Sequence, residues 1–159
     1  MIGYDLYPNE NAAKYIEYKT LDEVFEQADI ISLHCPLTAD NYHLINDESI
    51  AKMKDGVILI NTSRGQLMDA KALIEGVKSG KIGGVATDVY EYEYGIFHSN
   101  HQNNVISDET LLTLKSFPNV IVTPHYGFYT DEAVANMVEY TLENLYDFET
   151  KNDCKNKLA

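Results

Sequence analysis

The 159-residue chain is poor in cysteine and in basic residues, and it contains no long apolar run. Its two cysteines, Cys35 and Cys154, are too few for a disulfide framework, so we expect a reducing, cytoplasmic environment. No apolar run approaches the roughly 20 residues that span a bilayer, and we expect no membrane partner. The 12 basic and 25 acidic residues give a net charge of −13. We expect no nucleic-acid partner, because a phosphate backbone attracts basic surfaces.

Four short apolar runs are rich in β-branched residues and do not alternate strictly with polar residues. They begin at Ile30, Val57, Gly84 and Val120. This pattern is typical of strands that are buried on both faces of a parallel sheet. Their starts lie about 27 to 36 residues apart, close to the roughly 30 residues of a strand–helix–strand unit.

Amphipathic segments occupy the intervals between these runs. Thr20 and Glu23 have the spacing of a capping box, and apolar residues follow them with helical periodicity. A long final helix is expected over about residues 131–150. Other helices are expected behind polar caps at Asp47, Asp69 and either Ser107 or Asp108. The alternation of strands and helices predicts an α/β fold with a doubly wound parallel sheet.

Polar residues follow each predicted strand at its carboxyl end. Asp5 follows a short strand near the start of the chain, and His34-Cys35-Pro36 follows the Ile30 run. The other strands lead to Asn61 through Gly65, to Asp88 with Glu91 and Glu93 just beyond it, and to Pro124-His125. In open α/β sheets ligands bind outside the carboxyl ends of the strands, so we expect a ligand site at this edge.

Three of these residue types suit the reduction of a 2-oxo acid. The planar guanidinium of Arg64 matches a substrate carboxylate. His125 is able to exchange a proton near neutral pH, as protonation of a carbonyl oxygen requires. Glu93 is placed to accept a hydrogen bond from the other ring nitrogen and so to favour the imidazolium form.

Three ordered stretches carry a family resemblance: Asn-Thr-Ser-Arg-Gly at 61–65, Ala-Thr-Asp-Val-Tyr-Glu-Tyr-Glu at 86–93, and Thr-Pro-His at 123–125. They resemble the signature stretches of the D-2-hydroxyacid dehydrogenase family, and the match runs from Met1 to about Leu145. The resemblance, closest to the D-lactate dehydrogenases of that family, implies an NAD-dependent oxidoreductase that interconverts pyruvate and D-lactate.

The same resemblance implies the roles of individual residues. Arg64 is expected to bind the substrate carboxylate and carbonyl, His125 to act as acid and base, and Glu93 to partner it. Cofactor contacts are implied at Asp5, Cys35, Pro36, Asn41, Thr62, Ser63 and Asp88. An acidic residue such as Asp5 at the end of the second strand hydrogen-bonds ribose hydroxyls and repels a 2′-phosphate, which favours NAD over NADP.

The preference for a small substrate depends on Phe128, which resembles the apolar pocket residue of D-lactate dehydrogenases. Two alternatives remain open. One is a D-2-hydroxyisocaproate-type dehydrogenase, in which a tyrosine is expected at that position. The other is an NAD-sensing binding module of the co-repressor kind, which shares the Arg64, Glu93 and His125 positions.

The chain contains no G-x-G-x-x-G loop. The family places that loop and its central strand before the strand that begins here at Met1. We therefore expect an incomplete Rossmann-type NAD-binding domain over 1–130, with 131–159 forming a C-terminal helix and tail that return toward an absent substrate domain. We also expect a C-terminal fragment that is poorly stable and inactive alone, and a homodimer when full length.

The remaining candidates receive structural interpretations. His34 and His43 are interpreted as ordinary structural histidines, and Cys35 as a small packing residue rather than a nucleophile. His98 and His101 have a loose metal-ligand spacing, but no third ligand is evident and we expect no metal.

Overall fold

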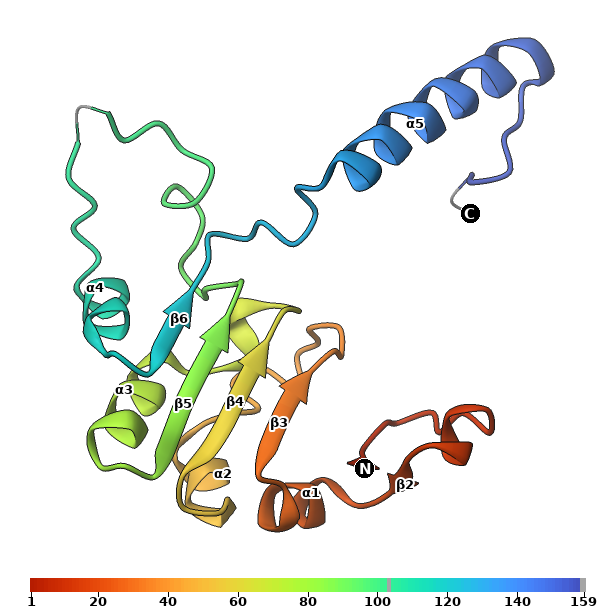
Figure 1. The fold of residues 1–159 in the computed structure, drawn as a ribbon. Coiled ribbons are helices and arrows are strands. Elements are labelled where there is room, and N and C mark those ends of the chain that lie inside the picture. The colour runs from red at the N-terminus through yellow and green to blue at the C-terminus, as the bar shows by residue number, and fades with distance from the viewer. Residues whose placement is uncertain (103, 158–159) are drawn as a thin grey trace. The chain divides into compact units, whose positions relative to one another are not determined.

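The computed structural model describes residues 1–102 and 104–157 and contains a parallel sheet of four strands (Figure 1). The strands pair in chain order: β3 (Ile30–Leu33), β4 (Val57–Asn61), β5 (Ile82–Thr87) and β6 (Val120–Val122). Two short strands, β1 (Ile2–Gly3) and β2 (Glu17–Tyr18), form a separate parallel pair. The predicted α/β class and its four main strands are confirmed.

Helices fill the intervals between these strands. They are η1 (Ala12–Lys14), α1 (Leu21–Gln27), α2 (Asp47–Lys52), η2 (Gly65–Leu67), α3 (Ala70–Lys78), α4 (Glu109–Ser116) and α5 (Asp131–Lys151). The predicted Thr20–Glu23 capping box is present. Asp69 and Asp108 cap α3 and α4 as expected.

The predicted cap of α2 was wrong by one residue. Asn46 is the N-cap, because its side chain accepts the Ser49 N–H at 3.0 Å while Ser49 Oγ accepts the Asn46 N–H at 2.9 Å. Asp47 instead occupies the first helical turn, where its charge faces the positive end of the helix dipole.

Helices α1 to α4 cover one face of the four-stranded sheet. The paired residues Ile31, Leu59, Val85 and Val120 are all buried on that face, in one cluster with Phe25, Ile50, Leu73 and Leu111 of the helices. Burial of this apolar face stabilises the sheet at roughly 25 cal/mol per Å². It also fixes the loops that leave the carboxyl ends of the strands.

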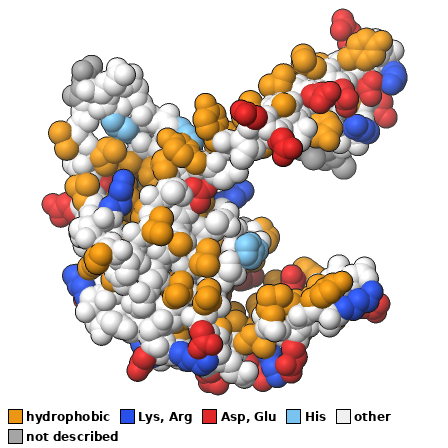
Figure 2. Space-filling view, in the orientation of Figure 1, with side chains coloured by type: hydrophobic (Ala, Val, Ile, Leu, Met, Phe, Trp, Pro, Cys, Tyr) orange, Lys and Arg blue, Asp and Glu red, His pale blue; other side chains and the backbone are white. Residues whose placement is uncertain are grey.

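The opposite face of the sheet is apolar and open to solvent in the described part of the chain. Ile30, Ile58 and Ile121 are 57, 40 and 63% exposed. Hydrophobic side chains gather over the strands in Figure 2. The described helices therefore supply one of the two layers of a doubly wound sheet.

The chain divides into two compact units, residues 1–125 and residues 126–159. The second unit consists chiefly of α5, which begins after the cap residue Thr130 and contains no buried residue. Met137, Leu142 and Leu145 are 48, 62 and 62% exposed along it. None of the described helices is both long enough and apolar enough to cross a membrane.

The open sheet face predicts how a polypeptide of residues 1–159 alone will behave. We expect strong fluorescence of a hydrophobic dye and association that rises with concentration, because an apolar face of this kind attracts other apolar surfaces. Ile58→Thr combined with Ile121→Thr is expected to reduce both signals. Val105→Thr, in an exposed loop, serves as the control. Monomeric, dye-free behaviour with cooperative unfolding would contradict this expectation.

Candidate active site

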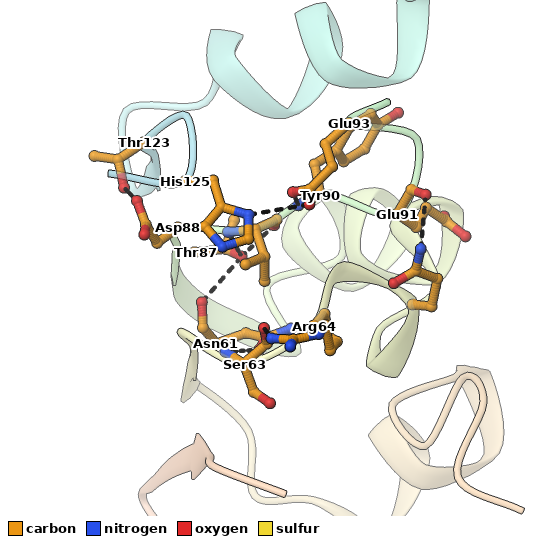
Figure 3. Close-up of polar contacts among 12 residues, drawn as sticks. Asn61, Ser63, Arg64, Thr87, Asp88, Tyr90, Glu91, Glu93, Thr123 and His125 are labelled. Atoms are coloured by element: carbon orange, nitrogen blue, oxygen red, sulfur yellow. Dashed lines mark hydrogen bonds and ion pairs between the residues drawn. The ribbon is translucent and has the colours of Figure 1, made fainter. Parts of the chain in front are cut away.

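The carboxyl ends of β3 to β6 lie at one edge of the sheet because all four strands are parallel. The loops that follow β4, β5 and β6 carry Arg64, Glu93 and His125, and Figure 3 shows these side chains with their neighbours. The structure thus brings the three predicted chemical groups to a common edge, within the first unit of the chain.

Asn61 shapes the turn that carries Arg64. This last residue of β4 is fully buried, and its Oδ1 accepts the Ser63 N–H at 3.0 Å. Its Nδ2 donates to the Arg64 carbonyl oxygen at 2.9 Å. The Asn61 carbonyl in turn accepts the Asp88 N–H at 3.0 Å, which joins this turn to the end of β5.

The Arg64 side chain is exposed, and its Nη1 donates to the Ser63 carbonyl oxygen at 2.8 Å. Within the described residues the guanidinium forms no ion pair with a carboxylate. Its remaining N–H groups are therefore available to bind an anion in the bidentate manner of arginine.

His125 and Glu93 form a hydrogen-bonded pair across 32 residues of sequence. His125 Nδ1 lies 3.0 Å from Glu93 Oε1, and Glu93 Oε2 accepts the Tyr90 N–H at 3.0 Å. An ionised carboxylate only accepts hydrogen bonds, so the Nδ1 atom carries a proton and Nε2 is left to exchange one. The His125 N–H donates to the Asp88 carbonyl at 2.7 Å.

The backbone of His125 has φ = 56°, in the left-handed region. This conformation costs energy for a residue with a Cβ atom, and residues held in it cluster at functional sites. The hydrogen bonds of its N–H and of its ring hold His125 in place at the end of β6.

Tyr90 anchors the loop that carries Glu93. Its ring is buried, and its hydroxyl donates to Asp108 Oδ1 at 2.9 Å. Burial, together with the Asp108 carboxylate, raises the pKa of the Tyr90 phenol well above its usual value. The phenol therefore stays a hydrogen-bond donor at any physiological pH.

Gly65 allows the Arg64 turn to pack directly against this loop. A Cβ atom at Gly65 would lie 2.1 Å from the carbonyl carbon of Tyr90 and 2.4 Å from the Glu91 nitrogen. Both of these are backbone atoms, which cannot move aside as a flexible side chain would. The distance between the Arg64 turn and the Glu93 loop is therefore set by the absence of a side chain at Gly65.

The residues predicted to contact the cofactor lie along the same unit. Asp5 is exposed after β1, and its Oδ1 accepts the Tyr7 N–H at 2.8 Å. Burial raises the pKa of the Cys35 thiol, with a smaller contribution from the Asp5 charge. The raised pKa lowers the fraction of reactive thiolate at neutral pH, and Cys35 lies near Asp5.

The loop after β3 is held by Asn41, whose Nδ2 donates to the Pro36 carbonyl at 2.8 Å and whose Oδ1 accepts the Thr38 N–H at 2.7 Å. Ser63 Oγ donates to the Cys35 carbonyl, and Asp88 Oδ1 accepts from the Thr123 hydroxyl. Thr62 is exposed. Exposed carboxylate and hydroxyl groups beside a small half-buried thiol fit the ribose and amide groups of a dinucleotide.

Phe128 belongs to the second unit of the chain, outside the unit that carries the site. His101 Nε2 lies 2.8 Å from the Ile96 carbonyl oxygen. No group of three or more histidine, cysteine or acidic side chains suited to a metal ion occurs among the described residues.

Sequence reasoning missed the contributions of Gly65, Glu91 and His43. Glu91 is buried and lies 2.8 Å from His43 Nε2, a histidine that we interpreted only as an ordinary structural residue. Gly65 was the one signal in the sequence for this arrangement, because a glycine next to a functional residue such as Arg64 indicates close approach of another backbone segment.

Replacing Gly65 with alanine tests the backbone contact. We expect Gly65→Ala to lower the free energy of unfolding by about 3 kcal/mol, since the added methyl overlaps a rigid peptide. Gly80→Ala is a matched control, because nothing lies within 4 Å of its added Cβ and its φ of +77° leaves only backbone strain. That strain costs about 1–2 kcal/mol. Urea unfolding of the intact protein measures both, and equal losses would refute the steric account.

Comparison with known proteins places this geometry in a family. The model of the D-isomer specific 2-hydroxyacid dehydrogenase NAD-binding domain matches residues 1–127. An aromatic 2-oxoacid reductase of Clostridium sporogenes is 66% identical over 157 residues, covering 99% of this chain and 47% of the relative. The D-lactate dehydrogenase of Escherichia coli is 42% identical and covers 100% of this chain and 49% of the relative.

A solved structure agrees with these relatives. A D-lactate dehydrogenase from Treponema pallidum superimposes with a TM-score of 0.92 at 40% identity, covering 99% of this chain and 48% of that structure. The chain thus spans about half the length of the proteins that it matches. Over this span, and with a parallel sheet whose carboxyl edge carries Arg64, Glu93 and His125, the chain belongs to the D-isomer specific 2-hydroxyacid dehydrogenase family through its NAD-binding domain.

Proposed function

We propose that the full-length protein that contains this chain is an NAD-dependent reductase of 2-oxo acids that forms D-2-hydroxy acids. The observation that carries the proposal is the pairing of His125 Nδ1 with Glu93 Oε1 at 3.0 Å, at the sheet edge that also bears Arg64. The family and its NAD-binding domain support the cofactor, and the relatives' names support the substrate class.

The residues of this chain divide the chemistry between them. The Arg64 guanidinium binds the substrate carboxylate and orients the neighbouring carbonyl. His125, protonated at both ring nitrogens, donates the Nε2 proton to the carbonyl oxygen, and Glu93 stabilises the imidazolium from which that proton departs. NADH, when bound, supplies the hydride that the carbonyl carbon receives. The carbonyl thus gains one hydride and one proton and becomes a hydroxyl-bearing carbon.

Two substrates satisfy this chemistry. The sequence pattern predicts pyruvate, chiefly through Phe128. The 66% identity to an aromatic 2-oxoacid reductase, against 42% to a D-lactate dehydrogenase, favours a 2-oxo acid with an aromatic side chain. We therefore propose an aromatic 2-oxo acid as the preferred substrate and pyruvate as the alternative. A homodimer and a cytoplasmic location remain part of the proposal.

Replacing His125 tests the reaction. In the full-length protein we expect His125→Ala to lower kcat about 10²- to 10⁴-fold, the usual contribution of a positioned acid. NADH affinity, measured by fluorescence titration, should stay nearly unchanged because His125 holds the proton and not the cofactor. His101→Ala is the control, since that ring contacts a backbone carbonyl in the loop after Glu93. Undiminished turnover in His125→Ala would reject the assignment.

The substrate is tested by kcat/KM of the full-length protein with phenylpyruvate and with pyruvate. We expect phenylpyruvate to be favoured by about tenfold or more, since a pocket shaped for a larger apolar group gains transition-state binding from it. A preference for pyruvate would support the D-lactate dehydrogenase alternative. Saturable NADH binding without turnover of either acid would favour the co-repressor-like sensor.

A further inference from the structure

Glu91 is a buried acidic residue that the proposed reaction does not use. Its side chain is 2% exposed. Oε1 accepts the Ala70 N–H, the first amide of α3, at 3.0 Å, and Oε2 lies 2.8 Å from His43 Nε2. A buried carboxylate is costly unless each oxygen has a donor, and here both have one.

These bonds join three segments that are far apart in the sequence. His43 belongs to the turn after β3, Ala70 follows the Arg64 turn, and Glu91 lies two residues before Glu93. The Gln66 side chain adds a bond to the Glu91 carbonyl at 3.3 Å. The Gly65 backbone packs on the Tyr90–Glu91 peptide.

The turn at His43 is itself fixed to the Arg64 segment by backbone hydrogen bonds. The His43 N–H donates to the Gln66 carbonyl at 2.9 Å, and the Ile45 N–H donates to the Leu67 carbonyl at 2.9 Å. The Tyr42 ring stacks on the His43 ring with 4.1 Å between centroids. His43 therefore presents Nε2 to Glu91 from a rigid support.

We propose that Glu91 is a positioning residue. Its bonds to His43 and to the first amide of α3 hold the Glu91 segment against the Arg64 turn. This clamp sets the separation of Arg64 from Glu93 and thereby orients the His125 ring that pairs with Glu93. This inference depends on the proposed 2-oxo acid reduction for its effect on turnover. Among the described residues no hydrogen bond or ion pair joins Glu91 to Arg64 or His125. Glu91 acts instead through the Gly65 contact and the short link to Glu93.

The donors around Glu91 set the roles of its two oxygens. The Ala70 amide can only donate, so Oε1 is an acceptor, and His43 Nε2 is the donor to Oε2 wherever the carboxylate is ionised. His43 Nδ1 faces Asp69 Oδ2 at 3.6 Å. The negative charge of Glu91 also raises the pKa of the neighbouring Tyr92 phenol.

Two substitutions at Glu91 separate positioning from simple space filling. Glu91→Gln keeps an oxygen for the Ala70 amide, and its NH₂ group can donate to His43 once that ring protonates Nδ1, toward Asp69, instead of Nε2. Glu91→Leu keeps the volume but leaves the Ala70 amide and the His43 ring without their acceptor. The glutamine variant should therefore retain the clamp and the leucine variant should lose it.

The test uses the full-length protein with NADH and phenylpyruvate or pyruvate. We expect Glu91→Leu to lower kcat about 10- to 100-fold with little change in NADH affinity, because small misplacements of reacting groups have effects of that size. Glu91→Gln should restore most of the lost kcat. His43→Leu should lower kcat as Glu91→Leu does. Because the His43 side chain is 24% exposed, this substitution should not create a buried cavity.

Lys81→Met is the stability control. Lys81 pairs with Asp55 Oδ1 at 2.8 Å at the amino end of β5, away from the carboxyl ends that carry the site. Loss of this pair should lower Tm and leave kcat unchanged. If Lys81→Met and Glu91→Leu lower kcat in proportion to Tm, Glu91 contributes only to stability and the proposal is overturned. If Glu91→Leu does not fold, an unchanged kcat in His43→Leu overturns it.

Hydrogen exchange gives a readout that does not need turnover. Peptides over residues 62–70 and 88–97 should exchange faster in Glu91→Leu and His43→Leu than in wild type or Glu91→Gln, because their shared anchor is lost. Wild-type protein without turnover would reject the proposed function. In that case unchanged exchange of both peptides in Glu91→Leu would separately reject the clamp.

Discussion

The contact between the Gly65 backbone and the Tyr90–Glu91 peptide is the constraint on which the site depends. A methyl group there would lie 2.1 Å from a backbone carbon, so the two loops meet only because one of them lacks a side chain. The pairing of Asn61 with Thr87 brings the ends of β4 and β5 together. The Gly65 contact keeps the loops that follow these two strands close together beyond the sheet. Arg64 on one loop and Glu93 on the other then occupy fixed positions relative to each other.

The fold was predictable where the determining interactions are local. The strands follow from runs such as Val57 to Ile60, which lies within β4, and the cap at Asp69 follows from a side chain that bonds amides two and three residues away. The α2 cap was misplaced because Asn46 and Asp47 are both good caps, and the choice between them depends on the reciprocal Ser49 bond. Which sheet face lies under the helices is visible only in the three-dimensional packing.

The chemical groups of the candidate site were predictable from the sequence, but the contacts that hold their loops in place were not. The motifs and the strand-end rule pointed to Arg64, Glu93 and His125, and the sheet brings them to one edge. The bond between Glu91 and His43 was not predictable, because 48 residues separate the two side chains in the sequence. Glu91 lies within the 86–93 signature stretch, but its partner His43 depends on the path of the folded chain, which the motif does not show.

The left-handed backbone at His125, with φ = 56°, narrows the range of residues that evolution can place there. Asparagine, aspartate and histidine are several-fold enriched among non-glycine residues with positive φ, and β-branched residues are nearly excluded. Of the three enriched types, histidine alone titrates near neutrality without perturbation. The backbone of the turn after β6 and the proton chemistry therefore both favour histidine at position 125. In a homologue that had lost the chemistry, asparagine would fit the same backbone conformation.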